Sequence, residues 1–122
     1  MKIVLDTNVL VSSFAARGIC ADLFRDILTS HELCLSDYIL DELEEKLLLK
    51  LKIPSPIVRS IRSLLQPYRV PTTKFLSDLQ VRDEDDIPIV NFAISIKADL
   101  LITGDKMLRE DCKDSPIRCI SP

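Results

Sequence analysis

Hydrophobic residues along the chain fall into short continuous runs, separated by longer stretches with helical spacing. The first run, KIVL at residues 2–5, contains the continuous apolar segment IVL, which is typical of a strand buried on both faces. Three further strands are predicted over residues 32–36, 99–103 and 117–121. Between the strands, helices are predicted over residues 21–30, 38–51, 57–65, 87–98 and 105–111. The pattern therefore predicts strands that alternate with helices.

Polar residues and prolines mark where these elements begin and end. Ser36 or Asp37 is predicted to cap the helix over residues 38–51, and residues 70–79 are predicted to be irregular. Pro88 falls in the first turn of its helix, where a missing N–H costs little. Strands that alternate with helices predict an α/β fold, a three-layer α/β/α sandwich with a mainly parallel central sheet. The 122 residues fit one domain over residues 1–122.

Composition narrows the classes of protein to which the chain can belong. Hydrophobic residues make up 47% and charged residues 29%, which is ordinary for a globular protein. The net charge of −3 gives no basic surface of the kind that marks many nucleic-acid binders, although acids neutralised by cations can conceal one. No apolar run reaches the about 18 residues that indicate a membrane span. Because no signal peptide precedes Asp6 either, we expect a cytoplasmic protein that does not enter a membrane.

Cysteine, histidine and glycine usage excludes several kinds of site. The four cysteines are scattered without a C-x-x-C pair, and in a reducing cytosol we expect free thiols. His31 is the only histidine and no zinc-ligand spacing is present. The two glycines, Gly18 and Gly104, cannot form a G-x-G-x-x-G or Walker A phosphate loop. A nucleotide cofactor is therefore not expected.

Carboxylates follow or precede the predicted strands at one edge of the sheet. Asp6 ends the first strand, and Asp105 follows the third. Glu42 lies early in the helix after the second strand, and Asp85 and Asp86 begin the helix that leads into the third. Ligands of open parallel sheets bind beyond the carboxyl ends of the strands, so we expect these acids to gather there. Clustered carboxylates repel one another, and hard divalent cations such as Mg²⁺ or Mn²⁺ relieve that repulsion and support phosphodiester hydrolysis.

Four segments carry a resemblance to a known family: IVLDTNVLVSSF, LSDYILDELEEKL, DEDDIPIVNFAISIKADLLITGDKML and IRCIS. Together they resemble a PIN domain, in the branch that includes the VapC toxins of toxin–antitoxin pairs, over nearly the whole chain. The resemblance implies a metal-dependent endoribonuclease that hydrolyses RNA with Mg²⁺ or Mn²⁺. It also implies a homodimer, and a toxin that is held in check by an antitoxin protein.

The same resemblance assigns roles to individual residues. The four residues implied as catalytic carboxylates and metal ligands are Asp6, Glu42, Asp86 and Asp105. The residues implied to support them by hydrogen bonds are Thr7, Asn8 and Thr103. Asp85 could compete with Asp86 for the third role, and Glu42 has competitors in Asp41, Glu44 and Glu45. Asp83 matches a family acid of unclear role, and Val90 and Asn91 depart from the family's Ala-rich helix.

Each of these acids also has a purely structural interpretation. Asp6 could be a turn residue, Glu42 part of a solvated helix face, Asp86 a first-turn acid and Asp105 a helix N-cap. The basic residues that could flank an RNA, or simply solvate two helices, are Lys46, Lys50, Lys52, Arg59 and Arg62.

Two other functional classes can be compared with the pattern. A PIN fold could bind RNA or protein without cutting, although the intact set of acids argues against this. A phosphoryl-transfer domain fits poorly. A response-regulator receiver needs paired acids near Met1, and a haloacid-dehalogenase-like phosphatase needs an Asp where Asn8 stands.

Overall fold

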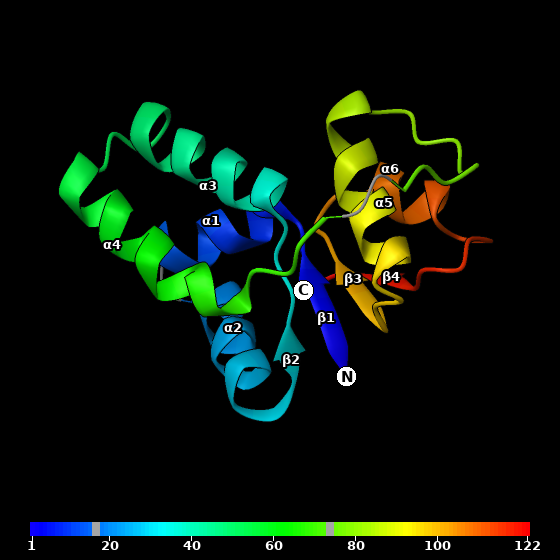
Figure 1. Cartoon of the computed structure of the whole chain (residues 1–122), viewed down its shortest axis with the longest axis horizontal. Coiled ribbons are helices and arrows are strands. Elements are labelled where there is room, and N and C mark those ends of the chain that lie inside the picture. Colours follow the sequence, from blue (N-terminus) through cyan, green and yellow to red (C-terminus); the bar gives the residue numbers. More distant parts are fainter. Residues whose placement is uncertain (16–17, 73–74) are drawn as a thin grey trace.

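The sheet is built from four short strands that all run parallel. The computed structural model describes residues 1–15, 18–72 and 75–122. Its strands are β1 (Lys2–Leu5), β2 (Glu32–Leu33), β3 (Leu100–Ile102) and β4 (Cys119–Ile120), in the spatial order β2-β1-β3-β4 (Figure 1). Ile3 pairs with Leu33 on one side and with Leu100 on the other, so β1 is a central strand. The parallel sheet that the sequence predicted is confirmed.

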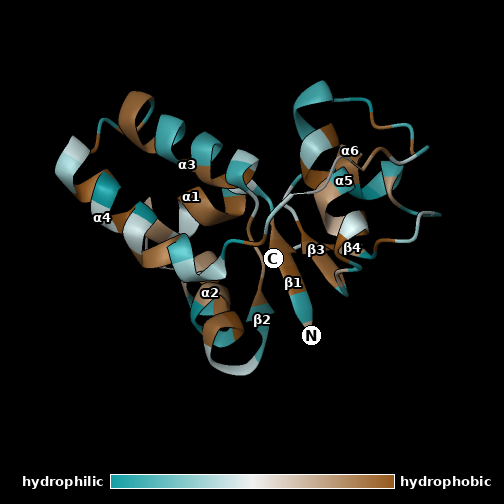
Figure 2. Cartoon of the chain, viewed as in Figure 1, coloured by the Kyte–Doolittle hydropathy of each residue, from teal (hydrophilic) through white to brown (hydrophobic). Residues whose placement is uncertain are grey.

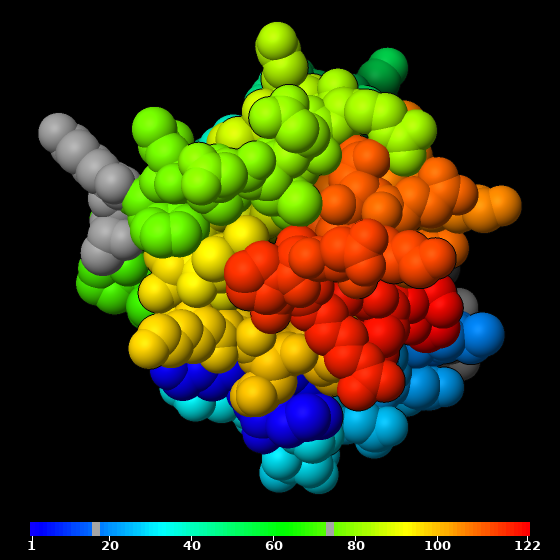
Figure 3. Space-filling model, turned by 90° about the vertical axis from the view of Figure 1, so that its right-hand side faces the viewer, coloured from blue at the N-terminus to red at the C-terminus, as the bar shows by residue number. Residues whose placement is uncertain are grey.

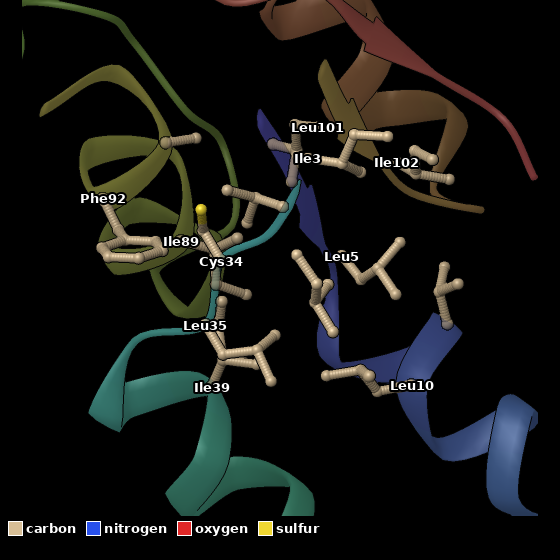
Figure 4. Packing of buried hydrophobic residues seen from close by; sticks show 14 of the residues in the cluster. Ile3, Leu5, Leu10, Cys34, Leu35, Ile39, Ile89, Phe92, Leu101 and Ile102 are labelled. Atoms are coloured by element: carbon tan, nitrogen blue, oxygen red, sulfur yellow. The ribbon is translucent and has the colours of Figure 1, made fainter. Parts of the chain in front are cut away.

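Burial of the central strands explains their apolar composition. Val4, Leu5 and Leu101 have 0% exposure, and Figure 2 shows β1 and β3 as largely hydrophobic. Burying one such side chain contributes about 1.5–3 kcal/mol. Figure 4 shows Leu5 of β1 close to Leu10 and Ile39, which come from two of the helices that cover the sheet.

Helices flank the sheet, as predicted for a three-layer α/β/α fold. They are α1 (Thr7–Ala15), α2 (Ile19–Ser30), α3 (Asp37–Leu49), α4 (Ser55–Leu65), α5 (Ile87–Ser95) and α6 (Lys106–Asp111), with 3-10 turns η1 (Gln66–Tyr68) and η2 (Glu84–Asp86). In Figure 1, α1–α4 gather on the left of the strands, and α5 and α6 on the right. α3 packs against α1 and α4 and also touches α5. No helix in the described part of the chain is long and apolar enough to cross a membrane.

The observed elements differ from the predicted ones in several places. The sequence prediction missed α1, because a helix begins at Thr7, directly after the strand, without the usual intervening loop. β2 is shorter than predicted; beyond it, Leu35 makes a parallel bridge with Arg69. That bridge covers the edge of the sheet next to β2. Residues 71–72 and 75–79 form no helix or strand, as predicted, and residues 73–74 of that prediction lie outside the described residues.

Candidate functional site

The neighbouring strands β1 and β3 are followed by connections that run in opposite directions along the sheet. The chain leaves β1 toward β2 on one side of the sheet and leaves β3 toward β4 on the other. Ligands of open parallel sheets bind in the crevice beyond the carboxyl ends of such a strand pair. Asp6 directly follows β1, and Thr103 directly follows β3. The topology therefore places two of the predicted site residues at the expected crevice.

Asp6 is held at the end of β1 by groups that come from β3. Its backbone N–H donates to the Ile102 carbonyl oxygen at 2.9 Å. Its Oδ2 accepts a hydrogen bond from Thr103 Oγ1 at 2.7 Å. Both side chains are buried, with exposures of 5% for Asp6 and 0% for Thr103. Thr103 Oγ1 also accepts a hydrogen bond from the Asp105 backbone N–H at 3.1 Å, so this hydroxyl joins two of the predicted carboxylate positions.

Asp105 is the N-cap of α6. Its Oδ1 accepts hydrogen bonds from the backbone N–H groups of Met107 (2.9 Å) and Leu108 (3.4 Å). Its second carboxylate oxygen, Oδ2, makes no hydrogen bond within the described part of the chain. The structural role considered for Asp105 is therefore present, and it leaves one oxygen for a ligand.

Thr7 and Asn8, the two residues after Asp6, both contact α3. The Thr7 hydroxyl, which is buried, donates a hydrogen bond to Glu42 Oε1. The exposed Asn8 accepts a hydrogen bond at its Oδ1 from Lys46 Nζ, at 2.8 Å. Thr7 thus fixes the position of Glu42 relative to the end of β1, and Asn8 fixes the nearest lysine.

Asp86 is the most strongly perturbed acid of the group. It has 9% exposure, and its Oδ2 is the one buried side-chain polar atom without a hydrogen-bond partner among the described residues. Its pKa is raised to about 7, mainly by burial and in addition by repulsion from four nearby carboxylates. Those four are Asp6, Asp83, Asp105 and Glu42. The other three predicted acids, Asp6, Glu42 and Asp105, are therefore close enough to Asp86 to affect its pKa.

The structure gives several of the competing acids other partners. Asp41 and Glu44 both pair with Arg62 of α4, each at 2.7 Å, so they link two helices. Glu42, between them, contacts Thr7. Glu45 lines the same groove as Glu42 and remains a competitor. Asp85 is exposed, and its backbone carbonyl oxygen accepts a hydrogen bond from a tyrosine hydroxyl. Asp85 therefore lies beside the cluster, while Asp86 lies within it.

Tyr38 is a site residue that the sequence analysis missed. Its hydroxyl donates to the Asp85 carbonyl oxygen at 3.0 Å. Burial, followed by repulsion from Glu42 and other nearby acids, raises its pKa to about 12, so the phenol stays protonated. Tyr38, Glu42 and Lys46 are spaced four residues apart on α3 and line a groove of about 440 Å³ that extends to Lys50. That i, i+4, i+8 spacing is the signal that could have identified it.

The donor chemistry of this cluster fits a hard divalent cation. Its side chains offer carboxylate oxygens, which Mg²⁺ and Mn²⁺ prefer, and Asp86 Oδ2 has no donor of its own among the described residues. Across residues 1–15, 18–72 and 75–122, no three His, Cys, Asp or Glu side chains converge as a ready-made ligand set. Mg²⁺ commonly keeps several waters and takes only one or two carboxylates, so a complete protein cage is not required. The unpaired oxygen and the mutual repulsion therefore mark this edge of the sheet as the candidate cation site.

Comparison with models of known protein families gives one match, which covers most of the chain. A model described as "PIN domain" matches residues 2–107, which include all four acids. A comparison with curated proteins found no match.

Solved structures with the same fold cover the chain almost completely. VapBC2 from Rickettsia felis, bound to a DNA fragment from its promoter, has a TM-score of 0.74 at 14% identity, covering 100% of this chain and 99% of that chain. VapBC-1 from nontypeable Haemophilus influenzae has a TM-score of 0.69 at 17% identity, covering 99% and 98%. The PIN domain endonuclease Utp24 has a TM-score of 0.57 at 23% identity, covering 99% and 84%. At these identities the likeness establishes the fold.

Proposed function

The chain belongs to the PIN domain family, and on that premise we propose that it is a metal-dependent endoribonuclease that hydrolyses RNA phosphodiester bonds. One observation carries the proposal: a buried Asp86 with an unpaired oxygen and a pKa near 7, surrounded by Asp6, Glu42 and Asp105. A protein gains no stability from crowding carboxylates in this way, so the arrangement indicates a site built for a cation. The proposed nuclease domain comprises residues 1–122.

In the proposed reaction the four carboxylates hold a cation, and neighbouring groups hold several of them in position. Asp6, Glu42, Asp86 and Asp105 would hold Mg²⁺ or Mn²⁺. The ion, when bound, would lower the pKa of water and offset the charge that develops on the phosphoryl group. Thr103 holds the Asp6 carboxylate and Thr7 holds that of Glu42, so neither side chain has to be reoriented when substrate binds. Asp105 keeps its capping bond to α6 with one oxygen and presents the other.

The groove along α3 is suited to a nucleic-acid strand. Lys46 and Lys50 line it together with Tyr38 and Glu42, so cationic side chains lie next to the acids. Lysine ammonium groups bind phosphates as point charges. Of the basic residues considered from the sequence, Arg62 is paired with Asp41 and Glu44. Lys46 and Lys50 line the groove that contains Glu42, which makes them the better candidates for this contact.

The biological setting follows from two of the structural neighbours. VapBC2 and VapBC-1 share the fold over nearly all of both chains. By that analogy, and from the sequence resemblance, we propose that the chain is the toxin of a toxin–antitoxin pair, with an antitoxin protein as its partner, and that it forms a homodimer in the cytoplasm.

Single-residue replacement at the cluster tests the catalytic proposal. Asp86→Asn and Asp6→Asn should each lower cleavage of single-stranded RNA in Mn²⁺ by at least about a hundredfold, because each removes a charge that the cation requires. The matched control is Asp26→Asn, an exposed acid on α2, which should cleave like the wild type. If Asp86→Asn and Asp26→Asn cleave equally well, the assignment is wrong.

The rival is a PIN fold that binds RNA or protein without cutting. Isothermal titration with Mn²⁺ separates the two, since a non-catalytic fold has no need of a cation at the four acids. Heat of binding that disappears in Asp86→Asn supports the nuclease. Failure of wild-type protein to bind Mn²⁺, together with inert behaviour on every RNA tested, supports the rival.

A further inference from the structure

An apolar pocket lies beside the carboxylate cluster and takes no part in the chemistry proposed above. It has a volume of about 490 Å³, within the range typical of small-ligand sites. Its walls include Tyr38 of α3, Phe75 and Leu76 of the irregular segment, and Pro88 and Asn91 of α5. Figure 3 shows the chain after residue 75 lying against α5. Phe75 is 39% exposed and Leu76 84% exposed, so the pocket presents apolar side chains to solvent.

Asn91 gives this apolar pocket one oriented polar group. Its Oδ1 accepts hydrogen bonds from the Ser77 backbone N–H (3.0 Å) and from Ser77 Oγ (2.7 Å). A backbone N–H can only donate, so the oxygen of the amide must face Ser77 and its NH₂ group is directed elsewhere. No hydrogen bond from that NH₂ group is found among the described residues. Asn91, a lining residue of the pocket, therefore has a hydrogen-bond donor that points away from Ser77.

Tyr38 connects this pocket to the cluster. The same ring lines the apolar pocket on one side and the groove with Glu42 and Lys46 on the other. Its hydroxyl is anchored to the Asp85 carbonyl oxygen, one residue before Asp86. A group bound in the pocket would thus lie one side chain away from the cluster.

We propose that this pocket binds an unpaired nucleobase of the RNA, next to the phosphodiester that the carboxylate cluster would cleave. The inference rests on the proposed nuclease function and adds a binding site for part of its substrate. Single-stranded RNA is recognised by stacking of splayed bases on aromatic side chains and by hydrogen bonds to base edges. Tyr38 and Phe75 supply the aromatic surfaces, and the Asn91 NH₂ group supplies a donor for a base carbonyl or ring nitrogen.

Charge favours a base over the sugar–phosphate backbone as the occupant. Among the described residues, no charged side chain lines the pocket. A phosphate there would have no cationic partner among those residues. A nucleobase is neutral, flat and polar only at its edges, which matches walls that are largely apolar and carry a few polar residues, Ser36, Thr72 and Asn91.

Nucleosides test the pocket without metal, phosphate or cleavage. The ¹⁵N-labelled protein in EDTA would be titrated with adenosine, cytidine, inosine and uridine, and followed by NMR. At least one nucleoside should shift the Asn91 side-chain NH₂ signals and the amides of residues 75–77 in a saturable way. Phe75→Ala should weaken that binding about tenfold, the loss expected for one stacked base. Leu64→Ala, an exposed apolar residue on α4 (62%), is the matched control and should bind like the wild type.

The outcomes separate this inference from the nuclease proposal. Absence of shifts with all four nucleosides, or shifts confined to residues outside the pocket, overturns the nucleobase site even if the protein cuts RNA. Pocket shifts in a protein that never cuts RNA uphold the site and contradict only the nuclease. A third possibility is that the pocket is an interface between two copies of the chain. Sedimentation velocity of Phe75→Ala and of the milder Phe75→Leu tests it by measuring the oligomeric state. If either variant changes the oligomeric state while nucleosides fail to bind, the pocket is an interface between two copies of the chain.

Discussion

Single residues decide the electrostatics of this fold. The charged form of Asp86 is poorly solvated and has four carboxylate neighbours. The nearby hydroxyls of Thr7 and Thr103 donate their hydrogen bonds to Glu42 and Asp6 instead. Without a cation, the protonated form of Asp86 is therefore favoured well above the pH at which an ordinary aspartate ionises. Ionisation of Asp86 therefore lowers the free energy of unfolding of the metal-free protein.

The metal-free protein should become less stable as the pH rises from about 4 to about 7. The folded-state pKa of Asp86, about 7, lies above the ordinary value of 3.8, so the native state binds this proton more tightly than the unfolded chain does. The loss from this one group is up to roughly 4 kcal/mol across that range. Urea denaturation in EDTA at several pH values measures it.

The Asp86→Asn variant is the check on that slope. Its side chain is neutral at every pH, so its free energy of unfolding should vary less between about pH 4 and 7 than that of the wild type. Asp26→Asn, which changes an exposed acid, should keep the wild-type slope. Equal slopes for wild type and Asp86→Asn would contradict the raised pKa.

At the scale of secondary structure, short helices carry both stability and site residues. α6 begins at Asp105, whose Oδ1 satisfies two backbone N–H groups. α3 begins at Ser36, whose Oγ accepts from the Ile39 backbone N–H at 3.2 Å. Both caps were among the sequence predictions, because Ser and Asp before an apolar periodic run are strong helix-start signals.

Asp105 should separate capping from charge when it is replaced in two ways. Asn is as good an N-cap as Asp, so Asp105→Asn should change the free energy of unfolding little while weakening Mn²⁺ binding. Asp105→Ala should weaken Mn²⁺ binding as well and also lose about 1 kcal/mol of stability. Thermal or urea unfolding in EDTA gives the first quantity, and calorimetric Mn²⁺ titration gives the second. If Asp105→Asn binds Mn²⁺ as the wild type does, Asp105 is only a cap.

The sequence predicts most of the secondary-structure elements, and it misses the features that depend on contacts between residues far apart in the chain. Strand ends and helix starts follow from local periodicity, and the carboxyl-edge rule predicts that acids gather there. The choice of Asp6, Glu42, Asp86 and Asp105 among those acids came from the resemblance to a PIN domain. The helix at Thr7 was missed because Val9, Leu10 and Val11 look equally like a strand that continues. The bridge of Leu35 to Arg69 and the choice of Glu42 over Asp41 and Glu44 depend on α4, which no local pattern reveals.

On the scale of the whole molecule, a bound cation should act as a stabilising ligand. The acids that follow β1 and β3 and those of α3 and η2 are close enough to affect the pKa of Asp86, so an ion bound among them would oppose unfolding of all these segments. Binding to the native state alone adds about 2.7 kcal/mol at a Mn²⁺ concentration about 100 times Kd.

Mn²⁺ should therefore raise the melting temperature of the wild-type protein by roughly 10 °C relative to EDTA under those conditions. Differential scanning calorimetry measures the shift. Asp6→Asn should show little of it, and Asp26→Asn should show all of it. A wild-type melting temperature that does not respond to Mn²⁺, Mg²⁺ or EDTA would remove the basis for a cation at this site.

The position of β1 at the centre of the sheet has a consequence for the timing of synthesis. Asp6 is bonded to Thr103, which lies 97 residues later in the chain, and the chain is made from its N-terminus. A nascent chain thus carries the first acid from the outset but cannot complete the cluster until β3 has been synthesised and has paired with β1. An incomplete chain therefore has no complete cation site, and the proposed cleavage would begin only after β3 has been made.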